Sequence, residues 1–298
     1  MFNNLKYSQH TPVLLQEILS LFSDENPPKN ILDCTFGRGG HSQAFLKKFP
    51  KAFILALDRD SSAIEFGLNL KEFKDGKIKL LNKNFYDYPL IFRDTQNFDF
   101  ILMDLGVSSP QLDNKERGFS FYKEGPLDMR MDQKQTLTAQ HIINEYSKKE
   151  LIQIFKKYGE IKNPSRVVSD IVKQRKRKKF ETTMELSRLI QKHYGFYKNK
   201  HPATTWFLAL RLAVNGELEG LIRCLDSYFN LLNSSGYWAV ISFHSLEDRI
   251  IKQGFRRFVK EGKGILYNKK VIQSQNEERK NNPRSRSAKL RVFQKLEI

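Results

Sequence analysis

One short segment constrains the fold of this chain more than any other, the run Ile31-Leu-Asp-Cys-Thr-Phe-Gly-Arg-Gly-Gly-His41. It has the form of an apolar strand that ends in an acid and passes into a glycine-rich turn. A second apolar run, Phe53–Asp58, also ends in an acid. Glycine accepts positive φ and lets a ligand approach the backbone closely, and an acid after the second strand is where ribose hydroxyls are usually held. The segment therefore predicts the nucleoside-binding half of a doubly wound α/β domain.

The spacing of the glycines separates classes of ligand. Gly37, Gly39 and Gly40 do not form the Gly-x-Gly-x-x-Gly pattern that places a dinucleotide pyrophosphate over a helix N-terminus. Asp33 stands in front of them, and an acid there suits a cationic ligand, such as the amino group and sulfonium of S-adenosylmethionine. The alternatives are a tight turn without a ligand and a nicotinamide-dependent oxidoreductase. The glycine spacing and the basic charge of the chain count against the oxidoreductase.

Composition indicates the class of protein and its cellular compartment. A chain of 298 residues can bury a large core, and 40% hydrophobic with 28% charged residues is typical of a globular protein. No apolar run approaches the roughly 20 residues of a membrane span, and the N-terminus lacks the layout of a signal peptide. The two cysteines, Cys34 and Cys224, are far apart. We therefore expect a protein of the reducing cytoplasm, with no structural metal.

The net charge of +18 is the second informative feature. Such an excess attracts polyanions and makes their binding sensitive to salt. Two basic blocks, Lys173–Lys179 and Arg279–Lys289, favour nucleic acid as the partner. The alternative is a compositional bias toward lysine that only keeps the protein soluble.

Alternating apolar runs predict a parallel sheet. Strand-like runs lie at 30–36, 53–58, 78–84, 98–105 and 237–243, with helical runs at 13–22, 42–48 and 61–73. Thr11 and Pro12 form a suitable helix start. After the helical run 246–260, the runs 264–272 and 289–296 predict an antiparallel pair at the sheet edge, and 273–287 reads as a mobile basic loop.

The segment between the fourth and fifth strands is too long for a loop. It carries helical patterns at 139–146, 148–157, 165–175 and 183–193 and no convincing strand, and Asn199–Pro202 marks the return to the sheet. We therefore predict an α/β domain formed by residues 1–112 and 201–298, interrupted by an inserted helical domain at 113–200.

Nine segments in order form a further set of motifs. They are Asp33–Ser42, Ala56–Asp60, Asp104–Asp113, Arg117–Phe121, Gly125–Asp132, His201–Thr204, Val214–Glu219, Ile241–Arg249 and Asn282–Arg291. Together they resemble one family, the bacterial ribosomal RNA small-subunit methyltransferase H family, also called MraW, and the resemblance runs from His10 to about Leu296.

This resemblance implies a class I, Rossmann-like methyltransferase fold whose inserted helical domain serves RNA recognition. It implies methyl transfer from S-adenosylmethionine to the exocyclic N4 amine of a cytidine in the decoding region of 16S ribosomal RNA. The partner would be 16S ribosomal RNA or the small ribosomal subunit. The alternative function is a ribosomal RNA-binding or assembly protein with a non-catalytic nucleoside pocket.

Carried over position by position, the resemblance implies a set of cofactor-binding residues. Asp58 would accept the ribose hydroxyls, the glycines would allow backbone approach, and Phe85 would pack on the adenine. Each has an alternative: Asp58 as a surface acid, Phe85 as ordinary core and His41 as a helix cap. The full set is Gly39, Gly40, His41, Asp58, Phe85, Asp104 and Gln111.

Asp104 is also the candidate catalytic residue. Cytosine's amino lone pair is delocalised, so an acceptor that localises it and aligns the reacting atoms aids the transfer. Asp104 follows the fourth strand, at the ligand-binding edge of such sheets, and its role stays open between binding cofactor, accepting from the amine, or both. Where related amino methyltransferases place an aromatic residue after the acid, this chain has Gln111, which leaves Phe119 and Phe121 as candidates for base stacking.

Four other residues are candidates for supporting roles. His244 follows the fifth strand and suits either a base or phosphate contact or a structural role. Asp128, Arg130 and Asp132 suit the ordering of the insertion better than catalysis.

Overall fold

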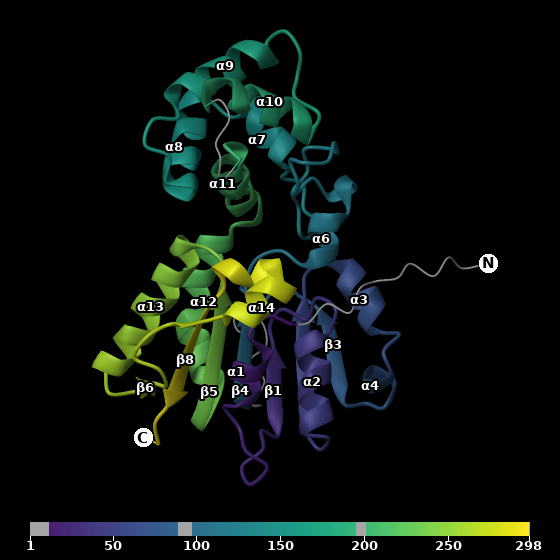
Figure 1. Cartoon of the computed structure of the whole chain (residues 1–298), viewed down its shortest axis with the longest axis vertical. Helices are drawn as coiled ribbons and strands as arrows, with labels where there is room; N and C mark the ends of the chain where they lie inside the picture. Colours follow the sequence, from purple (N-terminus) through teal and green to yellow (C-terminus); the bar gives the residue numbers. More distant parts are fainter. Residues whose placement is uncertain (1–11, 89–96, 195–200, 298) are drawn as a thin grey trace, which may run out of the picture. The chain divides into compact units, whose positions relative to one another are not determined.

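The computed structural model describes residues 12–88, 97–194 and 201–297. It divides into two compact units, shown in Figure 1: Met1–Gly106 together with Gly220–Ile298, and Val107–Glu219. Pro12 of the predicted helix start lies within the described residues. Thr11, and Asn199 and Lys200 of the predicted return segment, lie outside them.

The first unit contains one sheet in the order β3-β2-β1-β4-β5-β8-β6, with β7 paired to β8. Strands β1 to β5 run parallel, and β8 runs antiparallel to β5 and β6. The order reverses between β1 and β4, which creates a topological switch point where open α/β sheets bind ligands. The predicted doubly wound α/β fold is confirmed. The strands are β1 (Asn30–Asp33), β2 (Phe53–Asp58), β3 (Ile78–Asn82), β4 (Phe98–Asp104), β5 (Leu232–Ser242), β6 (Gly264–Leu266), β7 (Ile272–Gln273) and β8 (Lys289–Lys295).

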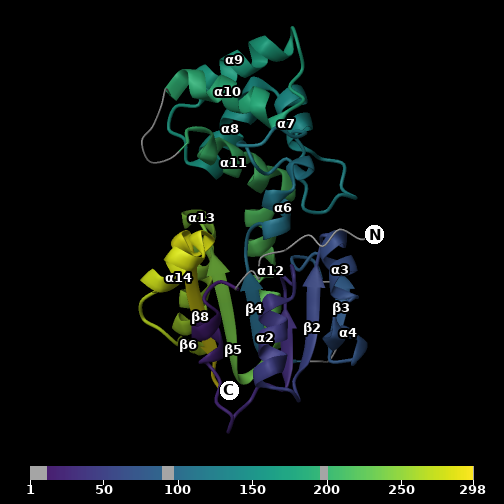
Figure 2. The same cartoon turned by 45° about the vertical axis from the view of Figure 1, so that its right-hand side comes forward.

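Neighbouring residues of each strand point to opposite faces of the sheet. Leu32, Leu55 and Ile101 pack in a core with α12 (Glu217–Leu231) and α13 (Ser245–Lys260). Ile31, Ile54 and Phe100, one position earlier, pack in a second core with α1 (Leu15–Leu19) and α2 (Gly40–Lys48). Apolar residues at consecutive positions therefore bury both faces, and Figure 2 shows helices of the two groups around β4. Short helices α3 (Ser61–Gly67) and α4 (Lys71–Lys74) link β2 to β3.

Several predicted elements differ from the structure. The first helix is shorter than 13–22, because Leu14 adopts the left-handed conformation (φ 54°) immediately before it. The run 264–272 is not one strand, because residues 267–271 lie between β6 and β7. The prediction of a mobile loop at 273–287 is wrong. That segment contains α14 (Asn276–Asn281) and a 3-10 helix, η2 (Pro283–Ser287), in which the buried Ser285 carbonyl accepts the Ser274 hydroxyl at 2.8 Å.

The second unit is helical, with a core around Phe155 and Trp206. Strand pairing in its described residues is limited to an isolated bridge between Pro126 and Thr182. Its limits differ from the expected 113–200, because α11 packs with α8 in this unit rather than with the sheet. The elements are α6 (Ser109–Asp113), η1 (Lys115–Arg117), α7 (Ala139–Glu145), α8 (Lys148–Gly159), α9 (Ser165–Arg175), α10 (Thr183–Tyr194) and α11 (Ala203–Asn215).

Candidate functional site

The candidate site lies in the first unit, at the carboxyl ends of β1, β2 and β4. Each of these strands ends in an acid: Asp33, Asp58 and Asp104. Burial raises the pKa of all three carboxyl groups, that of Asp58 to about 6 and that of Asp104 to about 8. Clustering acids away from water is costly unless a cation compensates them. The arrangement therefore favours a positively charged ligand.

In the turn after β1, neighbouring side chains fill most of the space beside the glycines, so little is left open for a ligand. Gly39 has φ +71°, and a Cβ there would lie 2.7 Å from the Phe36 ring; a Cβ on Gly40 would lie 2.7 Å from Pro12 Cγ. Both positions require glycine because neighbouring side chains fill the space. Gly37 (φ +56°) is not among the predicted cofactor residues, and a Cβ there would have only the Thr35 carbonyl oxygen within 4 Å, at 4.0 Å. Gly37 is thus the more open glycine of this turn.

Asp58 is not a free surface acid. Its Oδ2 accepts the Gly37 N–H at 2.8 Å and its Oδ1 accepts the Asp60 N–H at 2.9 Å. These bonds join the end of β2 to the glycine-rich turn. An ionised carboxylate has about four acceptor positions, so two remain that could receive ribose hydroxyls.

Asp104 is held at the switch point between β1 and β4. Its N–H donates to Thr35 Oγ1 at 2.7 Å. Its carboxyl oxygen Oδ1 is buried and has no hydrogen-bond partner among the described residues. Besides burial, the negative charges of Asp33 and Glu247 raise its pKa. A buried oxygen without a partner is the kind of group that a ligand completes.

His41 lies beside Asp104 on the first turn of α2. Its Nε2 is 3.1 Å from the Val13 carbonyl oxygen and its Nδ1 is 3.9 Å from Asp104 Oδ2. Burial lowers the pKa of His41 to about 4. At neutral pH the imidazole is uncharged, so its contact with Asp104 is not an ion pair. The helix cap considered for it falls instead to Gly39.

The end of β5 contributes His244 and Glu247 to the same edge of the sheet. His244 is the N-cap of α13: its Nδ1 accepts the Glu247 N–H at 3.4 Å, and its Nε2 is 3.0 Å from Glu247 Oε1. Glu247 also accepts the Phe243 N–H at 3.1 Å. His244 therefore caps its own helix through Nδ1, whereas its buried Nε2 has no hydrogen-bond partner among the described residues.

Phe85 follows β3 in the same unit and is buried. Its ring centroid is 4.1 Å from that of Tyr86, and its carbonyl oxygen accepts the Tyr228 hydroxyl at 2.8 Å. The ring belongs to the core on the α12 side of the sheet. This geometry matches the ordinary-core alternative, and contact with a ligand stays a prediction.

Gln111 belongs to the second unit. Its side chain is buried, and its Oε1 accepts the Ser108 N–H at 2.9 Å as part of the capping box of α6. Phe119 and Phe121 lie in the same unit: Phe119 is buried, and Phe121 stacks on His201 with ring centroids 4.8 Å apart. The structure thus groups six of the seven predicted cofactor residues in the first unit and Gln111 in the second.

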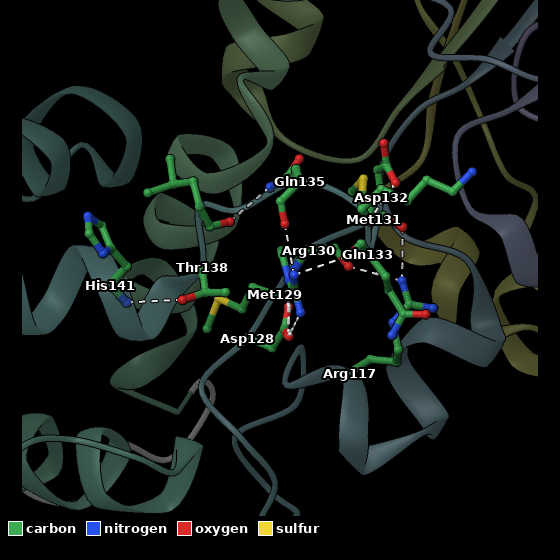
Figure 3. A network of polar contacts seen from close by, with 12 residues as sticks. Arg117, Asp128, Met129, Arg130, Met131, Asp132, Gln133, Gln135, Thr138 and His141 are labelled. Atoms are coloured by element: carbon green, nitrogen blue, oxygen red, sulfur yellow. Dashed lines mark hydrogen bonds and ion pairs between the residues drawn. The ribbon is translucent and has the colours of Figure 1, made fainter.

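Arg130 orders the start of the insertion, as Figure 3 shows. Its guanidinium binds both carboxylate oxygens of Asp128 and the carbonyls of Gln133 and Gln135. Asp132 accepts the Lys134 N–H at 2.9 Å. These contacts lie within the second unit and indicate a structural role for the three residues.

Asn215 and Arg117 complete this network, although neither was predicted from the sequence. Asn215 accepts the Met131 N–H and donates to the Met129 carbonyl, both at 2.8 Å. The Arg117 guanidinium donates to the carbonyls of Arg130 and Met131. Their place in two of the nine motifs was the signal that could have identified them.

Three other residues of the first-unit site were not predicted. Thr35 binds Asp104, Ser42 donates to Asp33 Oδ2 at 2.6 Å, and Glu247 raises the pKa of Asp104. Thr35 and Ser42 flank the glycines, and Glu247 stands three residues after His244 as in a capping box. The sequence shows that each of these residues belongs to a motif, but it does not show which residue each one contacts.

Two classes of feature are missing from the described parts of the chain. Residues 12–88, 97–194 and 201–297 hold no group of three or more His, Cys, Asp or Glu that could bind a metal ion. Within these same ranges, none of the helices has both the length and the apolar character required to cross a membrane.

Comparison with known proteins identifies the family. Residues 7–296 match the family described as MraW methylase family. A protein of Bdellovibrio bacteriovorus named Ribosomal RNA small subunit methyltransferase H is 49% identical over 292 residues, covering 96% of this chain and 88% of that protein. Proteins of the same name from Ureaplasma urealyticum and Persephonella marina are each 43% identical, covering 96% and 97% of this chain and 98% and 99% of theirs. This chain therefore belongs to the MraW methylase family.

Proposed function

We propose that the protein transfers a methyl group from S-adenosylmethionine to the exocyclic N4 amine of a cytidine in the decoding region of 16S ribosomal RNA. Family membership and the name shared by the relatives support a ribosomal RNA methyltransferase. The observation that carries the proposal is the half-buried Asp104 carboxyl group at the switch point, whose buried oxygen Oδ1 has no hydrogen-bond partner among the described residues. The charge of +18 suits an RNA substrate.

The residues present fit this cofactor. Its amino group and sulfonium are cationic and would compensate the acids Asp33 and Asp104, whose pKa values are raised by burial. Asp58, at the end of β2, would receive the ribose hydroxyls. We assign cofactor binding to Gly39, Gly40, His41, Asp58, Phe85, Asp104 and Gln111, with the two glycines acting through the shape of the turn.

When bound, the cofactor supplies a methyl group on a positively charged sulfur. Asp104, once ionised, accepts a hydrogen bond from the cytosine amine and localises its lone pair. His41, neutral at physiological pH, holds its unprotonated Nδ1 toward Asp104. The neighbouring acid Glu247 strengthens the local negative potential. Methyl transfer then depends on the alignment of the amine nitrogen, the methyl carbon and the sulfur, and the placement of these residues favours that alignment.

The test is methylation with purified protein, isotopically labelled S-adenosylmethionine and two substrates, unmodified 16S ribosomal RNA and small ribosomal subunits. Mass spectrometry of the digested nucleosides should show label in N4-methylcytidine, in one or both substrates. Asp104→Ala should reduce the single-turnover rate at saturating cofactor. Lys263→Gln, a change on the β6 side of the sheet, is a control that removes a charge from the same unit.

The possible results separate the functions. Label at C5 of cytosine, or at a ribose hydroxyl, would contradict transfer to the amine. Binding of both cofactor and RNA without transfer to either substrate would favour the alternative, an assembly protein with a non-catalytic nucleoside pocket. Binding of a nicotinamide nucleotide in preference to S-adenosylmethionine would contradict both.

A further inference from the structure

Glu278, on α14, is joined to the candidate site by a contact across almost the whole sequence. Its Oε1 accepts the N–H of Leu14 at 2.9 Å. Leu14 is fully buried and has φ 54°, a left-handed conformation that is unfavourable for a residue other than glycine. Such a conformation persists only when the surroundings impose it. The Glu278 carboxylate is one of the contacts that do so.

The residues beside Leu14 touch the glycine-rich turn. Pro12 Cγ occupies the space beside Gly40, where a Cβ would lie only 2.7 Å away. The Val13 carbonyl oxygen is 3.1 Å from His41 Nε2. The backbone of residues 12–14 is thus wedged between α14 and the start of α2. Because β7 and the start of β8 pair beside the carboxyl end of β5, α14 lies at the same edge of the sheet as the acids; Figure 1 shows α14 at that edge.

The Val13 contact decides which nitrogen of His41 carries the proton. A carbonyl oxygen only accepts, so Nε2 must be the donor, and a neutral imidazole then has an unprotonated Nδ1. That nitrogen is the one 3.9 Å from Asp104 Oδ2. If the Val13 carbonyl moves, His41 loses the contact that selects this form.

We propose that Glu278 is a positioning residue for the site: by accepting the Leu14 N–H, it holds the Val13 carbonyl where it fixes the Nε2-protonated form of His41 beside Asp104. The C-terminal segment 273–287 is thereby coupled to the site through two backbone groups and one side chain. The role of the site as a methyl-transfer site rests on the proposed function, but the coupling itself does not.

The experiment compares Glu278→Ala, Glu278→Gln and the matched control Glu277→Ala. Glu277 is an exposed acid on the same helix, and glutamine keeps an acceptor oxygen while it removes the charge. Nitrogen-15 NMR of histidine, with His41 assigned through His41→Asn, reports the protonated nitrogen. We expect a single Nε2-protonated form in the wild type, Glu278→Gln and Glu277→Ala, and a mixture of forms in Glu278→Ala.

A second readout is the dissociation constant of S-adenosylmethionine by calorimetry, with Tm measured in parallel. Loss of one hydrogen bond predicts weakening by about twofold to tenfold in Glu278→Ala alone. A lower Tm in Glu278→Ala with unchanged His41 tautomer and cofactor affinity would overturn the proposal, since the contact would then be merely structural. Glu278→Gln behaving like Glu278→Ala would also overturn it. Failure of the wild type to bind S-adenosylmethionine would refute the proposed function, while the tautomer readout would still test the coupling.

Discussion

At the scale of single residues, the three acids at the strand ends determine the electrostatics of the site: Asp33 is buried, and Asp58 and Asp104 are half-buried. The pKa of Asp104 is raised to about 8, above that of Asp58. Its close neighbours include the acids Asp33 and Glu247 and the neutral His41. At neutral pH most of Asp104 is therefore protonated in the protein alone. A protonated carboxyl group can donate one hydrogen bond but is a weaker acceptor. A cation bound beside it would lower its pKa and restore the acceptor.

This electrostatic state predicts a pH dependence of methylation. Because the ionised form of Asp104 is the acceptor, kcat/KM should rise with pH until about 8, the pKa in the protein alone. The rise in kcat should occur at lower pH, since the bound cation favours ionisation. Asp104→Asn should lower kcat more than it raises the cofactor's KM and should remove this limb of the profile. Single-turnover rates between about pH 5.5 and 9 are the measurement, and a rate within about twofold of the wild type would exclude Asp104 from catalysis.

The same shift affects folding. The native state keeps a proton on Asp104 that the unfolded chain has released, between the ordinary pKa of 3.8 and about 8. The stabilisation from this group is present below the lower value and is lost as the pH rises through the upper one. Denaturant unfolding should therefore show Asp104→Asn gaining free energy of unfolding relative to the wild type as the pH rises from about 4 to 8. A constant difference across this range would contradict the raised pKa.

Asp58 makes a separate prediction for cofactor affinity. Its pKa of about 6 means that the acceptor is lost as the pH falls through 6, so the wild-type affinity for S-adenosylmethionine should decrease there. Asp58→Ala should weaken binding by about 1–3 kcal/mol, because ribose hydroxyls lose their acceptors. Calorimetry measures this, with Glu65→Gln, a change at an exposed acid of α3, as the control. Asp58→Ala also frees the N–H groups of Gly37 and Asp60, so Asp58→Asn is needed to separate binding from turn geometry. Equal affinity in folded Asp58→Ala would remove Asp58 from the cofactor set.

At the scale of elements, the stability of the turn from β1 to α2 depends on which atoms lie where a side chain on each glycine would begin. Gly37→Ala and Gly39→Ala should both cost roughly 1–2 kcal/mol for a positive φ. Gly39→Ala should cost about 1–3 kcal/mol more, because its Cβ would meet the Phe36 ring at 2.7 Å. Thermal unfolding of the two variants measures the difference. The opposite order would mean that the turn does not pack against Phe36 in solution.

At the same scale, Asn215 links α11 to the start of the insertion. Asn215 binds the backbone of Met129 and Met131, and Met129 has a positive φ of 64°. Asn215→Ala would leave the buried Met131 N–H unpaired, at a cost of about 1–3 kcal/mol. Denaturant unfolding should show this loss, whereas Gln153→Ala on the exposed surface of α8 should change little. An Asn215→Ala protein as stable as the wild type would show that water replaces the amide.

At the scale of the whole molecule, the net charge of +18 predicts binding to RNA that weakens with salt. Within the basic block 173–179, Lys178 and Lys179 pair with Glu185 and Glu145, at 2.7 and 2.8 Å. Lys176 and Arg177 have no ion pair among the residues that the structure describes, and Arg177 is exposed.

The two pairs of cations allow a matched comparison. Neutralising Lys176 and Arg177 with glutamine should reduce the salt slope of RNA binding by about 0.7 for each phosphate that these side chains neutralise. The same change at Lys178 and Lys179 removes an equal charge but should reduce the slope less. Filter binding of 16S ribosomal RNA from about 50 to 300 mM salt, the range in which such slopes are resolved, gives both values. Equal slopes in the two variants would show that only total charge matters, and an unchanged slope in both would place the RNA elsewhere on the protein.

The class of fold, the order of the strands along the chain and four helices of the insertion, α7 to α10, were predictable from the sequence alone, and α9 was predicted with both its limits. It could do so because these features follow from local periodicity and from residues that stand next to one another. It also placed Asp58 and Asp104 at strand ends. The family assignment was carried by nine motifs together and is confirmed by the matching family.

The hydrogen-bond partners of these residues, in contrast, follow from the tertiary structure. Asp58 binds Gly37, Asp104 has an oxygen without a partner in the described residues, and Glu278 holds Leu14 at a separation of 264 positions. It also ordered the segment 273–287, whose polar composition indicated a loop, because burial of Ser274 and Ser285 supplies contacts that composition does not record. Burial and long-range pairing depend on how distant segments pack, so the pKa of each acid and the tautomer of His41 follow from the fold and not from the order of the residues.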